Sequence, residues 1–60
     1  MDKYTIIYGY AYTNYSNCVN VVCEKEQLQA IGTAICLGAN ADWCVAQKDH
    51  QDILTIADCM

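Results

Sequence analysis

The sequence predicts a small α+β protein, a two-layer ββαββ arrangement in which an antiparallel sheet carries one helix on one face. Three observations predict it: two segments of strand-forming residues open the chain, a segment with helical spacing follows, and two short apolar segments end it. The length of 60 residues, the absence of proline and the lack of a Gly/Ser-rich linker predict a single domain over residues 1–60.

The two opening segments are predicted to form an antiparallel hairpin. Residues 4–13 are rich in Tyr, Ile and Thr, and residues 18–23 are rich in Val, which are compositions that favour a half-buried strand. Residues 14–17, Asn-Tyr-Ser-Asn, tolerate turn geometry and can hydrogen-bond their own backbone. They are therefore the predicted turn.

A helix is predicted over residues 24–37. Its first turn carries glutamates, which the positive end of the helix dipole favours. Apolar residues then recur at helical spacing, namely Leu28, Ile31 and Ile35. We expect Gly38 to end the helix in a left-handed conformation, and Gly32 to allow close approach to the sheet beneath.

The last third of the chain allows two interpretations. Residues 43–46 and 53–57 can form two strands joined by a polar turn at residues 48–52, and the β-branched residues near position 55 favour this hairpin. The same segment also has apolar residues at helical intervals, with Asn40 as a possible N-cap, so ββαα is the alternative fold.

Tyrosines dominate one side of the first predicted strand. Alternation places them on the face opposite to Ile7, Gly9 and Ala11. We expect the helix to lie on the small residues, because these leave room for it, and the tyrosines to face outward as a protein interface. The predicted partner-binding anchors are Tyr4, Tyr8, Tyr10 and Tyr12.

Two other interpretations of the tyrosine side stay open at this point. A solvated ladder of rings can simply stabilise neighbouring strands, and the tyrosines can instead lie beneath the helix. Stacking on RNA is disfavoured, because the lysines and arginines that such a face needs are missing around it.

Charge is unevenly distributed. Three lysines, no arginine and a net charge of −4 disfavour direct binding of nucleic acid, and no stretch approaches the roughly 20 apolar residues of a membrane helix. Residues 4–23 carry no charge. We expect an acidic rim in the last third that steers the chain toward a basic protein partner and consists of Asp42, Asp49, Asp52 and Asp58.

The five cysteines are predicted to be free thiols. The opening residues lack the basic and apolar segments of a secretory signal, so we expect a cytoplasmic, reducing location. The cysteine spacing lacks a paired C-x2-C motif, and no metal or other cofactor is expected. Cys23 precedes the predicted helix, whose N-terminus can lower a thiol pKa, and His50 is expected in a turn.

These features together predict a small acidic, non-enzymatic protein–protein interaction module. We expect an inhibitor that docks on a larger protein complex, and nucleic-acid-binding complexes are one class of such partners. Small phage inhibitors, including anti-CRISPR proteins, share its size and charge, but no residue motif carries a resemblance. The alternatives are a self-associating homodimer without an inhibitory role, and a thiol or redox protein that uses Cys23.

Overall fold

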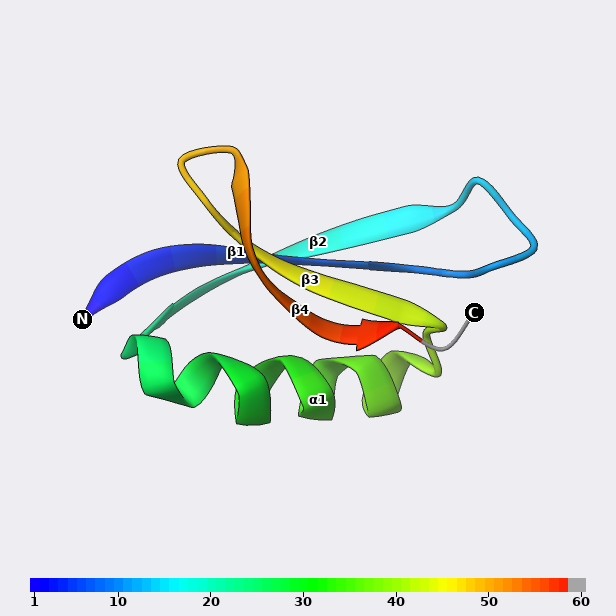
Figure 1. The fold of residues 1–60 in the computed structure, drawn as a ribbon. Helices are drawn as coiled ribbons and strands as arrows, with labels where there is room; N and C mark the ends of the chain where they lie inside the picture. The colour runs from blue at the N-terminus through cyan, green and yellow to red at the C-terminus, as the bar shows by residue number, and fades with distance from the viewer. Residues whose placement is uncertain (59–60) are drawn as a thin grey trace.

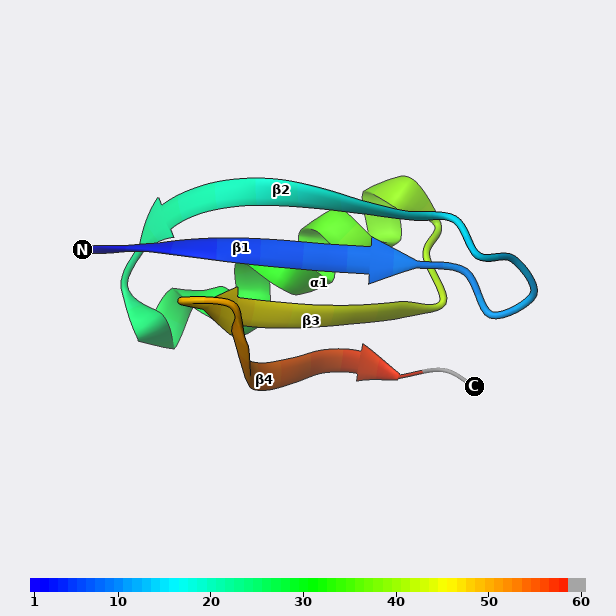
Figure 2. The ribbon, with the colours of Figure 1, turned by 90° about the horizontal axis from the view of Figure 1, so that it is seen from above.

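One antiparallel sheet and one long helix make up the fold. The computed structural model describes residues 1–58. The elements in chain order are β1 (Asp2–Gly9), β2 (Ser16–Cys23), α1 (Leu28–Ala39), β3 (Trp43–Lys48) and β4 (Gln51–Asp58). The strands lie in the order β2-β1-β3-β4, and α1 lies across one face of this sheet (Figure 1, Figure 2). The predicted ββαββ fold is confirmed.

The first hairpin has a longer turn than the sequence predicts. β1 and β2 pair from Asp2 opposite Cys23 to Gly9 opposite Ser16, so residues 10–15 form the connection. The prediction that the first strand continues to residue 13 is wrong. The backbone N–H of Ala11 donates to the Asp42 carboxylate (2.8 Å), and this contact draws the chain toward the start of β3 instead of along β2.

The helix begins and ends close to the predicted positions, with a different C-cap. A short 3₁₀ helix, Lys25–Gln27, leads into α1, and the Glu24 N–H donates to the side-chain oxygen of Gln27 (3.0 Å). The predicted cap at Gly38 is wrong, because that residue stays inside the helix. Asn40 adopts the left-handed conformation (φ 57°) and ends the helix, a conformation that asparagine tolerates better than most residues.

The last third forms the predicted hairpin and not the alternative helix. β3 and β4 are joined by Asp49 and His50, which both have positive φ (54° and 66°). A two-residue turn of this kind matches the twist of antiparallel strands. The pairing of β4 with β3 shifts register at two points, after Cys44 and after Ala46, so β4 is an irregular edge strand.

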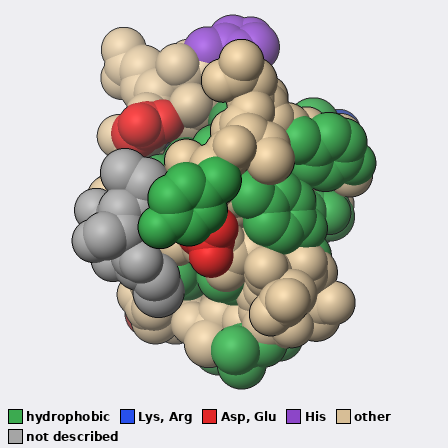
Figure 3. Space-filling view, turned by 90° about the vertical axis from the view of Figure 1, so that its right-hand side faces the viewer, with side chains coloured by type: hydrophobic (Ala, Val, Ile, Leu, Met, Phe, Trp, Pro, Cys, Tyr) green, Lys and Arg blue, Asp and Glu red, His purple; other side chains and the backbone are tan. Residues whose placement is uncertain are grey.

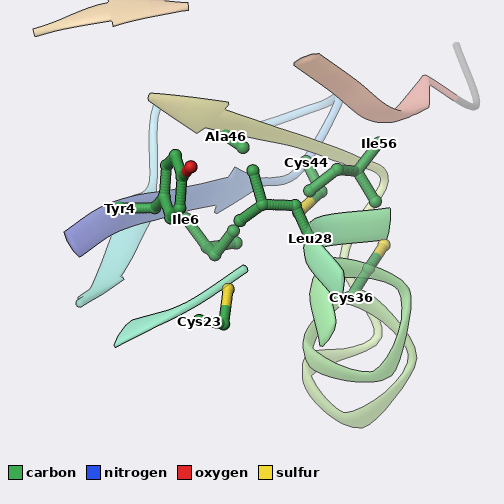
Figure 4. Packing of buried hydrophobic residues seen from close by; sticks show 8 residues of the cluster. All are labelled: Tyr4, Ile6, Cys23, Leu28, Cys36, Cys44, Ala46 and Ile56. Atoms are coloured by element: carbon green, nitrogen blue, oxygen red, sulfur yellow. The ribbon is translucent and has the colours of Figure 1, made fainter. Parts of the chain in front are cut away.

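The core lies between α1 and the sheet. Figure 4 shows side chains from all the elements that enclose it. Its buried members are Tyr4, Ile6, Cys23, Leu28, Cys36, Cys44, Ala46 and Ile56. A Cβ atom added to Gly32 would lie within 2.1 Å of the Ile56 side chain, which confirms that this glycine allows close approach. In the described part of the chain, no helix combines the length and apolar character that crossing a bilayer requires.

Candidate functional site

The tyrosine side of β1 faces α1 and not solvent, so the predicted orientation is wrong. Tyr4 is 4% exposed and Ile6 is fully buried, and both contribute to the core under the helix (Figure 4). Tyr8 packs against the same cluster. Tyr4 is therefore unable to anchor a partner as an exposed ring. The room for these large side chains comes from their neighbours on β3, Cys44 and Ala46, which are small.

The opposite side of β1, predicted to receive the helix, faces away from it. Its shallow surface at Gly9 is occupied instead by the indole of Trp43, the residue paired with Gly9 across β1 and β3. A Cβ atom on Gly9 would lie 2.3 Å from the Trp43 ring. Gly9 thus leaves room for the Trp43 ring of the neighbouring strand. The small size of Gly9 is therefore used by this ring and not by the helix.

The remaining tyrosines gather where the β1–β2 connection meets the C-terminus of α1. We call this surface the loop end, and it comprises Tyr10, Tyr12, Tyr15, Asp42 and Trp43. Figure 3 views the molecule from this side, where hydrophobic side chains gather around an acidic group. The Tyr10 hydroxyl donates to the Ala39 carbonyl oxygen (2.7 Å), which ties the loop to the helix. The rings of Tyr10 and Tyr15 lie 5.9 Å apart between centroids and are tilted by 34°.

Asp42 supports the loop end from the β3 side. Its carboxylate accepts the Ala11 N–H, and its own N–H donates to the Gly9 carbonyl oxygen (2.8 Å). The chain is therefore held at residues 9, 10 and 11, immediately before Tyr12. The Tyr12 side chain is 98% exposed and that of Tyr15 is 58% exposed. The geometry presents two aromatic rings to solvent beside a carboxylate.

The predicted acidic rim is divided between the two ends of the sheet. Asp42 belongs to the loop end, and the backbone of Asp58 pairs with Trp43 there, while the Asp58 side chain lies outside the described residues. Asp49 lies in the β3–β4 turn at the opposite end, and Asp52 accepts a hydrogen bond from the Gln47 amide (2.5 Å) close to that turn. The four acids thus do not form one continuous surface.

The end opposite to the loop end carries most of the charge, and we call it the charged end. All three lysines of the sequence lie there, in β1, in the 3₁₀ helix and at the end of β3. The N-terminal ammonium lies 3.6 Å from Glu24, and Lys48 lies 3.4 Å from Asp2. These pairs are exposed and contribute little stability. Their arrangement leaves acidic and aromatic groups without a neighbouring lysine at the loop end.

The cysteines divide into buried and exposed thiols. Cys23 is 3% exposed, so it does not offer the accessible thiol that a redox role would need. Burial, and next the neighbouring Cys36, raise the pKa of the Cys44 thiol, which lies 3.7 Å from the Gly32 carbonyl oxygen. Cys18 is exposed. Within residues 1–58, no three His, Cys, Asp or Glu side chains come together in a way that would hold a metal ion.

Two members of the loop end, Tyr15 and Trp43, are not among the partner-binding residues that the sequence predicts. Tyr15 lies in the predicted turn, and its position among polar residues there is the signal that predicts an exposed ring. Trp43 joins the site through its pairing with Gly9, and that register is not readable from either segment alone. Comparison with protein-family models, with curated proteins and with solved structures gives no match to this chain.

Proposed function

We propose that this chain is a non-enzymatic protein-binding module that docks through the loop end on a basic surface of a larger protein and thereby inhibits it. The observation that carries the proposal is the 98% exposed ring of Tyr12 on a loop held by hydrogen bonds at Tyr10 and Ala11. Such a ring offers a large contact area, and it loses little conformational freedom on binding because its supporting backbone is already ordered.

The chemistry of the loop end favours an arginine-bearing partner. The guanidinium group stacks on aromatic faces and pairs with carboxylates, and Tyr12, Tyr15 and Asp42 supply both kinds of group. The net charge of −4 speeds encounter with a cationic surface. Basic surfaces commonly serve to hold nucleic acid, so a module seated on one would exclude that ligand.

Photo-crosslinking from the loop end tests the binding surface. A benzophenone amino acid replaces Tyr12 in one variant and Ile53, near the charged end, in a matched control. After irradiation in a host lysate, we expect a protein adduct from position 12, and its yield should fall as salt is raised. Equal adduct yields from both positions would show that the loop end is not the binding surface. A yield that does not change with salt would show that electrostatic attraction does not drive the binding.

Competition tests the inhibitory part separately. Purified partner, identified from the adduct by mass spectrometry, is mixed with labelled nucleic acid and increasing amounts of the chain. We expect displacement of the nucleic acid, and a double variant Tyr12→Ala/Tyr15→Ala should require at least about tenfold more protein, as for the loss of hot-spot rings. A stable ternary complex would show binding without inhibition.

A further inference from the structure

The two edges of the sheet differ in how they are protected against pairing with another strand. The β4 edge has two register shifts and carries Asp52, and bulges and charges are common means of blocking an edge. The β2 edge pairs with β1 in unbroken register over its whole length from Ser16 to Cys23 and has no charged residue. An edge strand that is long, regular and uncharged can form backbone hydrogen bonds with a further strand.

Alternation in the ladder shows which backbone groups of β2 face outward. The Gly9 carbonyl accepts a bond from Asp42 at the β3 side, so the odd residues of β1 direct their backbone groups toward β3. The residues of β2 opposite to them, among them Cys18, Asn20 and Val22, therefore direct their N–H and C=O groups away from the sheet. The contact from the Cys18 N–H to its neighbour's side chain, Asn17 (2.9 Å), agrees with this orientation.

We propose that the β2 edge pairs with β2 of a second copy of this chain, antiparallel and centred on Asn20. A two-fold axis through that position sets each Asn20 opposite its counterpart. The side chains on each face then match in polarity: Val19 lies opposite Val21 of the second copy, and Cys18 lies opposite Val22. Antiparallel pairs of β-branched residues and matched amides stabilise a sheet, and no charged side chain lies between residues 17 and 23 to oppose the pairing.

The pairing would join the two sheets into one continuous sheet with both helices on the same side. Because the strands run in opposite directions, the loop end of each copy lies beside the charged end of the other. The two loop ends then point away from each other. This inference does not depend on the proposed inhibitory function, since it rests on β2 and leaves Tyr12 free.

The oligomeric state and a charge substitution test the proposal. Light scattering coupled to size exclusion should show a dimer that forms across the micromolar to millimolar range. Asn20→Lys places two like charges opposite each other at the axis, and we expect the dissociation constant to rise at least about tenfold at low salt. The matched control is Ala30→Lys on the exposed side of α1, which should leave the dimer unchanged. Far-UV circular dichroism verifies that both variants fold.

Amide hydrogen exchange gives a measurement that needs no variant. In the wild-type chain, the N–H groups of Asn20 and Val22 should gain protection as concentration rises, while those of Val19 and Val21, already bonded to β1, should stay protected throughout. A monomer at millimolar concentration with rapid exchange at Asn20 and Val22 would overturn the proposal. So would a dimer that Asn20→Lys leaves intact.

Disulfide trapping tests the register. An Asn20→Cys substitution in a Cys18→Ser, Cys59→Ser background brings two thiols together at the axis, where paired Cα atoms lie about 5.5 Å apart, within disulfide range. Mild oxidation should give a covalent dimer. In the proposed register the native Cys18 thiols are offset by about 13 Å, so the chain without Asn20→Cys should not crosslink through them. Rapid crosslinking at Cys18 instead would overturn the register.

Discussion

The two faces of β1 carry neighbouring isoleucines, yet one face belongs to the core and the other is open. Ile6 and Ile7 are adjacent and chemically identical, but Ile6 is fully buried beneath α1 while Ile7 is only partly buried on the uncovered face. The difference comes from their cross-strand neighbours. Ile6 pairs with Ala46, which leaves space for the helix above, whereas Ile7 pairs with Val45 on the other face.

The residues beside a strand therefore decide which of its faces a helix covers. Small residues on β1 suggested that the helix packs there, but the space it needs is supplied by Cys44 and Ala46 of β3 and by Gly32 of the helix itself. The small residue of β1, Gly9, receives Trp43 instead. A large side chain on one strand and a small one on the next fill the same layer.

Replacing each isoleucine in turn should give the largest contrast. Ile6→Ala leaves a cavity under α1 and should lower the free energy of unfolding by about 2–5 kcal/mol. That is a large share of the about 3–9 kcal/mol expected for a chain of this length, so this variant should unfold at a much lower urea concentration than the wild type. Ile7→Ala, on the open face, should cost roughly 1 kcal/mol. Urea unfolding followed by circular dichroism measures both, and equal losses would contradict the assignment of the faces.

Adding a methyl group at Gly9 tests how Trp43 packs on the open face. Gly9→Ala forces the Trp43 indole off the strand and should lower stability by about 1–3 kcal/mol, with a shift of tryptophan emission toward longer wavelength. Gly38→Ala is the control, because nothing lies within 4 Å of the added atom. It should stabilise the helix by about 0.5–1 kcal/mol. An unchanged emission in Gly9→Ala would show that the ring lies elsewhere.

The order and type of the elements were predictable because each depends on local properties. β-Branched and aromatic residues favour strands, and the spacing of Leu28, Ile31 and Ile35 favours a helix. The helix end was misplaced by two residues, because asparagine and glycine both tolerate the left-handed conformation and either was available there.

The candidate site was less predictable because it depends on pairing between distant segments. Tyr12 is exposed as predicted, but the reason differs: the sequence places it on the outer face of the first strand, whereas β1 ends at Gly9 and Tyr12 lies in the connection that follows. The burial of Tyr4 required knowing that β3 joins the sheet beside β1, and the gathering of Asp42 at the loop required knowing where β1 ends. Neither fact is encoded within a single segment.

The hydroxyl of Tyr10 should have a smaller effect than either packing change. Tyr10→Phe removes the bond to the Ala39 carbonyl and should lower stability by about 0.5–1.5 kcal/mol. The loop should also become more mobile, because the hydrogen bond from Ala11 to the Asp42 carboxylate must then hold it without the help of Tyr10. Amide exchange at Ala11 measures this mobility. Tyr15→Phe is the matched control. Equal exchange in the two variants would show that the Tyr10 hydroxyl does not hold the loop.

The smallest effect should appear in the alkaline range, where the buried side of β1 responds to pH. Burial, and next the nearby Asp2 carboxylate, raise the pKa of the Tyr4 hydroxyl above its ordinary value of 10.0. The folded chain therefore holds this proton more tightly than the unfolded chain does. The resulting stabilisation is complete below pH 10 and is lost as pH rises through the folded pKa.

Tyr4→Phe should weaken this pH dependence. Between pH about 9 and about 11, the urea midpoint of the wild-type chain should fall more steeply than that of Tyr4→Phe. Tyr12→Phe should follow the wild type, because the exposed Tyr12 ring leaves the core unchanged. The Cys44 thiol, whose pKa burial also raises, contributes equally to all three chains and cancels in the comparison. Parallel curves for Tyr4→Phe and the wild type would contradict a buried Tyr4 hydroxyl, because a hydroxyl in water on the open face would titrate alike in the folded and unfolded chains.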